Sequence, residues 1–189
     1  MVVYLISEQT IKDTTVLNEN VDPKLIAPAI LESQDIHIQS ILGSNLFNKI
    51  TTLVGNKSIS GTTNADYKLL LDSYITPALK YYVLAELVLP MTIKLMNKSI
   101  ATRTSEFSNS IQIDDMALVR ENFMNKAEYY GERLINYLKD NTTTYPEYLL
   151  STGTALFSTI IPKRSSYTSG MYLGDEDIRE NFGFDYPRK

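Results

Sequence analysis

Residues 77–96 read PALKYYVLAELVLPMTIKLM. Apolar side chains occupy nearly every face of a helix in this stretch, and Glu86 is one of the few charges that interrupt them. A helix that is apolar all round is buried on all sides, so the pattern predicts that residues 78–96 form the central helix of the protein. Pro77 suits the start of that helix, because the N–H group that proline lacks would have no helical partner there.

Other helical patterns flank this stretch on both sides. Asp22 before Pro23 is a helix start signal, because its side chain can accept from free N–H groups of the first turn. Gly43 predicts the end of the helix that begins there. Apolar spacing predicts three further helical segments, which are 45–54, 65–75 and a long helix whose stripe runs from Met116 to Leu138. We therefore expect a mainly α fold, built as a compact helical bundle.

Three segments lack helical periodicity. Residues 1–20 are expected to be a short extended segment that includes a strand or hairpin, and residues 97–113 a long inter-helix loop rich in Ser, Thr and Asn. After residue 140 the apolar residues are scattered among Tyr, Gly, Ser and Pro. The sequence thus predicts a helical domain at 1–140 and an extended C-terminal arm at 141–189.

The polar residue Gln34 falls inside the apolar arc of the first long helix. A buried amide without hydrogen-bond partners costs about 1–3 kcal/mol. We therefore expect Gln34 to bond a neighbouring helix end or a loop carbonyl.

Composition excludes several classes of function. The 189-residue chain has a formal net charge of -4, whereas tight nucleic-acid binding relies on clustered Lys and Arg, so we expect no sequence-specific DNA reader. Cysteine is absent, which excludes disulfides, thiolate metal sites and cysteine nucleophiles. The most apolar run, 81–91, is far below the roughly 20 residues that span a bilayer, so we expect no membrane partner.

Catalytic motifs are missing as well. His37 is the single histidine, no Gly-x-Ser-x-Gly elbow accompanies it, and one histidine cannot supply the two Glu-x-x-His pairs of a di-iron bundle. Residues 55–61 have the wrong spacing for a phosphate loop, and residues 175–177 (Asp-Glu-Asp) lack the glycine of a calcium loop. We interpret His37 as a packing or interface residue. The protein is expected not to be an enzyme and to use no catalytic residue, cofactor or metal.

Aromatic residues populate the predicted arm. Large aromatic side chains on an otherwise polar, extended segment are typical anchors for a protein partner. We therefore predict these partner-binding residues: Tyr145, Tyr148, Phe157, Tyr167, Met171, Tyr172, Phe182, Phe184 and Tyr186.

Several sequence blocks, taken in order, carry a family resemblance. The first are NVDPKLIAPAI at 20–30, SQDIHI at 33–38 and ILGSNLF at 41–47. YKLL at 67–70, YITPAL at 74–79 and AEYYGERL at 127–134 follow. Together they resemble the head-tail connector (adaptor) proteins of tailed bacteriophages, known chiefly from phages of Bacteroidetes-type hosts. The resemblance covers residues 4–148.

The resemblance implies a structural subunit that assembles with copies of itself into a twelve-fold ring beneath the portal protein. Such a ring would extend the DNA channel, let DNA pass without sequence preference, and dock further tail or connector proteins. It implies a protein made in the host cytoplasm and located in the virion, at the portal-tail junction.

Three alternatives remain open from the sequence. A tail-completion or stopper ring could use the same helical framework. A small helical cell-wall hydrolase would need a protonated acid and a second carboxylate across a cleft, and pairs such as Glu128 and Glu132 have a spacing that a solvated helix face also produces. A cytoplasmic regulator would need a basic recognition helix.

Overall fold

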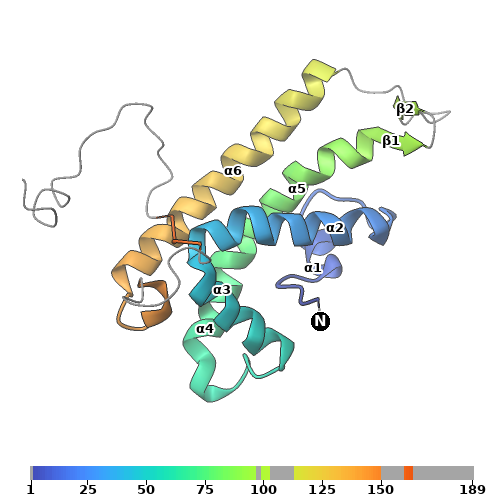
Figure 1. Ribbon diagram of the computed structural model, residues 1–189. Helices are drawn as coiled ribbons and strands as arrows, with labels where there is room; N and C mark the ends of the chain where they lie inside the picture. Colours follow the sequence, from blue (N-terminus) through green and yellow to red (C-terminus); the bar gives the residue numbers. More distant parts are fainter. Residues whose placement is uncertain (1, 97–98, 103–112, 150–159, 164–189) are drawn as a thin grey trace, which may run out of the picture.

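The computed structural model describes residues 2–96, 99–102, 113–149 and 160–163 (Figure 1). It confirms the mainly α class. The helices are α1 (Glu8–Thr14), α2 (Pro23–Ser33), α3 (Gln39–Gly55), α4 (Ala65–Leu70), α5 (Thr76–Thr92) and α6 (Ile113–Asp140). Two π-helical turns, η1 (Gln34–Ile38) and η3 (Leu71–Ile75), and two 3-10 turns, η2 (Thr62–Asn64) and η4 (Pro146–Tyr148), lie between or after them. Strands β1 (Ile93–Met96) and β2 (Ser99–Thr102) pair antiparallel.

Helix α5 is the central helix, as its sequence predicts. It packs against α6 on one side and α2 on another (Figure 1). Leu84 of α5 and Leu134 of α6 are buried in the shared core. The helix ends at Thr92 rather than at residue 96, because the chain turns extended at Ile93 and its backbone groups then pair with β2.

The break predicted at Gly43 lies inside α3. Gly43 has φ +73° and ψ 161°, a conformation that is essentially restricted to glycine, so the helix changes direction there. The segment Ile160–Lys163 lies against this break. Ser44 N donates to Ile160 O at 3.0 Å, and Lys163 N donates to Ser40 O at 2.8 Å. Pro162 is buried against Gly43.

The prediction of an extended N-terminal segment is wrong for part of it. Ser7 caps helix α1, because its side-chain oxygen accepts from Thr10 N at 3.0 Å, and Ile11 of that helix is fully buried. Preceding residues attach to Gln34, which accepts from Leu5 N at 2.6 Å and donates to Val3 O at 3.1 Å. The expectation that the buried Gln34 amide bonds a loop carbonyl is confirmed.

The body of the protein also extends beyond residue 140. Tyr145 and Tyr148 are buried, and Tyr145 Oη donates to Asp66 O of α4 at 2.9 Å. Tyr67 Oη donates to Glu147 Oε2 at 2.9 Å, which holds η4 against the same helix. The predicted boundary at 140/141 is therefore wrong, because residues 141–149 complete the core. The rest of the predicted arm, apart from 160–163, lies outside the described residues, as do 97–98 and 103–112 of the predicted inter-helix loop.

Candidate functional site

A groove of about 530 Å³ lies between α2, the C-terminal half of α5 and the N-terminal half of α6. Its lining is largely apolar, and it carries charged groups at Lys24, Glu32, Glu86 and Arg120. The apolar part comes from all three helices and includes Leu25, Pro28, Val88, Leu89, Met116 and Ala117.

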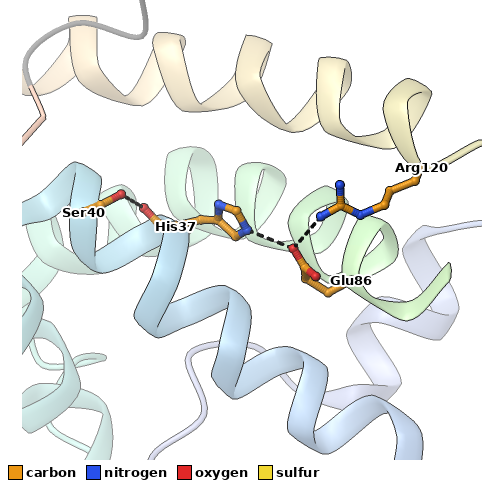
Figure 2. Close-up of polar contacts among 4 residues, drawn as sticks. All are labelled: His37, Ser40, Glu86 and Arg120. Carbon is orange, nitrogen blue, oxygen red and sulfur yellow. Dashed lines mark hydrogen bonds and ion pairs between the residues drawn. The ribbon is translucent and has the colours of Figure 1, made fainter. Parts of the chain in front are cut away.

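Glu86 is the centre of a charged cluster on this groove (Figure 2). Its Oε1 lies 3.2 Å from His37 Nε2 and 3.4 Å from Arg120 Nη2. The three residues come from η1, α5 and α6, so a single carboxylate oxygen links three segments of the bundle. The wider turn of η1 places His37 out of the register of a continuous α-helix.

The cluster does not assemble a nucleophile with a base. Ser40 Oγ donates to the backbone oxygen of His37 at 2.6 Å, and not to the imidazole ring (Figure 2). Acyl transfer by a Ser-His pair requires the serine hydroxyl to be hydrogen-bonded to the histidine ring. The imidazole stacks on Tyr82, with ring centroids 4.1 Å apart. The contacts of His37 in the described structure are therefore those of a packed, cross-linking side chain.

A cavity of about 200 Å³ lies beside His37 and Tyr82, and Glu128, Gly131 and Lys163 also line it. A Cβ on Gly131 would lie 3.1 Å from Tyr82 Oη, so glycine lets α6 approach α5 closely here. Burial, followed by the negative charge of Glu128, raises the pKa of Tyr82 to about 12. The phenol therefore stays neutral at physiological pH.

Large apolar residues are exposed where α5 ends and α6 begins. Leu89 is 51% exposed and Leu118 is 66% exposed, and Met91 and Val119 are also exposed. We call these four residues the apolar tip. The end of α5 and the start of α6, to which these residues belong, lie away from α4 (Figure 1). Exposed large apolar groups near the end of one helix pair fit an interaction site.

Within the described residues, no group of three or more His, Asp or Glu side chains is arranged to hold a metal ion. The helices in that part of the chain also include none that is long and apolar enough to cross a membrane.

Comparison with known proteins adds one result. A family of unknown function (DUF6712) matches residues 38–158, which is more than half of the chain. The chain belongs to the DUF6712 family. The matched span contains Glu86, Arg120 and the whole apolar tip, whereas α1 and α2 precede it. No curated protein and no solved structure gives a significant match.

The partner-binding residues predicted for this DUF6712 protein fall into two groups. Tyr145 and Tyr148 are buried in the chain's own core and cannot anchor a partner, so the prediction is wrong for both. Tyr145 and Tyr148 flank Pro146 and Glu147 after the end of α6, and this local pattern gives no sign that α3 and α4 receive them. The other seven lie outside the described residues: Phe157, Tyr167, Met171, Tyr172, Phe182, Phe184 and Tyr186.

Sequence reasoning missed the apolar tip and the Glu86 cluster of this family member. A usable signal existed for Glu86, which is a carboxylate inside an apolar run and therefore needs a partner. Nothing in the spacing points to His37, which lies 49 residues away along the chain. The exposure of Leu89 could not be read from a helix that is apolar on every face.

Proposed function

We propose that this protein is a structural subunit of the head-tail connector ring of a tailed bacteriophage. In this role it binds the portal protein, extends the DNA channel and docks the next tail component. The observation that carries the proposal is the apolar tip, because a ring subunit must present an adhesive surface that a lone folded chain leaves in water. The ordered sequence blocks at residues 20–47, 67–79 and 127–134 supply the family resemblance.

The Glu86 cluster suits a subunit that must keep a fixed shape in an assembly. Its carboxylate joins α5 to both η1 and α6, directly beside the groove that leads to the tip. Fixing the relative positions of these segments would let each subunit present the same tip geometry to its neighbour. A closed ring requires that repeated geometry, because a small angular error accumulates around the ring and leaves it open.

The test is to measure the mass of the purified full-length protein by light scattering and to image it by electron microscopy, alone and with the portal protein of the same phage. We expect closed rings of one size that form a layer on the portal. Rings that form but do not bind the portal protein would instead favour a tail-completion or stopper ring. A chain that stays monomeric and leaves the portal unbound would overturn the proposal.

A further inference from the structure

A row of partly buried aromatic rings lies at the edge of the contact between α6 and the η3–α5 segment, where the rings pack against the core. Tyr81 of α5 stacks on Tyr130 of α6, with centroids 5.4 Å apart and planes 9° from parallel. Two turns further along, Tyr74 of η3 stacks on Tyr137 at 3.9 Å and 16°. We call this row, together with Phe123, the aromatic seam.

Three cations lie over the aromatic seam. Lys80 Nζ is 5.3 Å and Lys126 Nζ is 6.0 Å from the centre of the Tyr81 ring. Arg133 Cζ is 5.0 Å from the centre of the Tyr74 ring. Among the described residues, none of the three cations forms an ion pair with a carboxylate. The seam thus carries three cations that form no such ion pair, in a chain whose formal net charge is -4.

The seam is accessible and has the composition of a binding surface. Lys126 and Arg133 are exposed, and Tyr129, which is 67% exposed, adds an edge-on ring beside Tyr130. Tyrosine and arginine are, with tryptophan, enriched at binding hot spots. A partner for this surface would combine carboxylates for the cations with apolar or aromatic groups for the rings.

The chain itself contains a segment of that chemistry. Residues 171–182 hold the run Asp175-Glu176-Asp177 between Met171-Tyr172 and Phe182. We propose that this acidic segment, from a neighbouring copy of the chain, docks on the aromatic seam. Its carboxylates would pair with Lys80, Lys126 and Arg133, and its apolar residues would cover the tyrosine rings. The proposal rests on the connector-ring function, for which it identifies one contact between subunits.

The last described residue before the acidic segment lies on the side of α6 away from the seam. Lys163, the last described residue before the acidic segment, lines the cavity that also contains Glu128 and Glu132. These glutamates lie two positions on either side of Tyr130, about 200° around the helix from it. The arm therefore leaves the body beside carboxylates, on the side of α6 that faces away from the seam.

Charge reversal tests this contact in the full-length protein. The double substitution Lys126→Glu/Arg133→Glu reverses the charge of the seam. The double substitution Asp175→Lys/Asp177→Lys reverses charges of the acidic segment. We expect each variant alone to raise the dissociation constant for self-association about tenfold or more. Mixing the two variants should restore association, because the arm of each then complements the seam of the other. Lys57→Glu/Lys139→Glu, two exposed positions outside the seam, is the matched control and should behave as wild type.

Far-ultraviolet circular dichroism and thermal melting establish that each variant is folded. Variants that lose association alone but do not recover it on mixing would overturn docking between copies. Rings that form as readily with the reversed seam as without it would overturn the inference and leave the connector function standing.

A labelled peptide of residues 164–189 separates the two proposals. If the wild-type chain associates without forming a ring or binding the portal, and the peptide binds it but not the seam-reversed chain, the contact between copies stands and the connector function fails. Equal binding of the peptide to both chains overturns the inference. Binding of a duplex DNA probe to the seam, without binding of the peptide, would also overturn the inference.

Discussion

The imidazole of His37 stacks face to face on the phenol ring of Tyr82, with centroids 4.1 Å apart and planes 6° from parallel. This contact joins η1 to the central helix at the point where Glu86, one turn further along α5, reaches His37 Nε2. The imidazole of the single histidine is thus held by an aromatic ring on one face and by a carboxylate at its Nε2 atom. Both contacts are structural, and they suggest where the bundle is most sensitive to substitution.

The first prediction concerns Glu86. Glu86→Gln removes the charge that His37 and Arg120 share, and we expect it to lower the free energy of unfolding by about 1 kcal/mol, since the groups are partly exposed. Urea unfolding measures the change. Glu32→Gln is the control, because Glu32 lines the same groove without an ion pair among the described residues. Equal effects of the two substitutions would contradict a special role for Glu86.

The second prediction concerns Gly43. Gly43→Ala should cost about 1–3 kcal/mol of unfolding free energy, because its backbone conformation is nearly restricted to glycine. The new Cβ would also lie 2.7 Å from Pro162 Cδ, so Ile160–Lys163 would have to move. Combining Gly43→Ala with Pro162→Ala should therefore cost less than the sum of the two single substitutions. Strict additivity in denaturant unfolding would show that this segment does not dock at the break.

Much of this fold is predictable from local pattern. Asp22 accepts from Lys24 N at the start of α2, the chain turns at Gly43, and α5 is buried as its all-round apolarity predicts. Each of these features depends on neighbours within a few residues. A capping side chain or a glycine conformation acts locally, so its sequence signal is local as well.

The remaining features depend on contacts that are remote along the chain. Tyr145 reaches Asp66 across 79 residues, so an aromatic residue after the last helix looks like a free anchor although it fills the core. The aromatic seam also depends on contacts between residues remote along the chain, because Lys80 and Lys126 belong to different helices. The π-helical turns η1 and η3 have no recognisable sequence signature, yet they set which side chains face α5 and α6.

The third prediction follows from Tyr82. Burial first, and then the charge of Glu128, raises the pKa of Tyr82 from 10.0 to about 12. The folded state therefore keeps a proton that the unfolded chain releases near pH 10. Its stabilising contribution is complete below pH 10 and is lost as the pH rises towards 12. Tyr67 and Tyr145 are shifted in the same direction, also chiefly by burial.

Tyr82→Phe tests this linkage, because it removes the titrating group and keeps the ring. The variant's unfolding free energy should fall less steeply than that of wild type between pH 10 and pH 12, measured by urea unfolding at several pH values. Tyr129→Phe is the control, since Tyr129 is 67% exposed. Parallel pH profiles for wild type and Tyr82→Phe would contradict the argument.

The last prediction concerns the apolar tip. Leu89→Ser/Leu118→Ser replaces two side chains that are 51% and 66% exposed, so the fold of the lone subunit should lose little stability. In a ring these leucines would be covered, and burial of a large aliphatic side chain stabilises a contact by about 1.5–3 kcal/mol. We therefore expect the variant to melt within a few degrees of wild type and to sediment as a monomer. Leu69→Ser, at a 48% exposed position on α4, should keep the rings. Intact rings in the double variant would place the subunit interface elsewhere on the molecule.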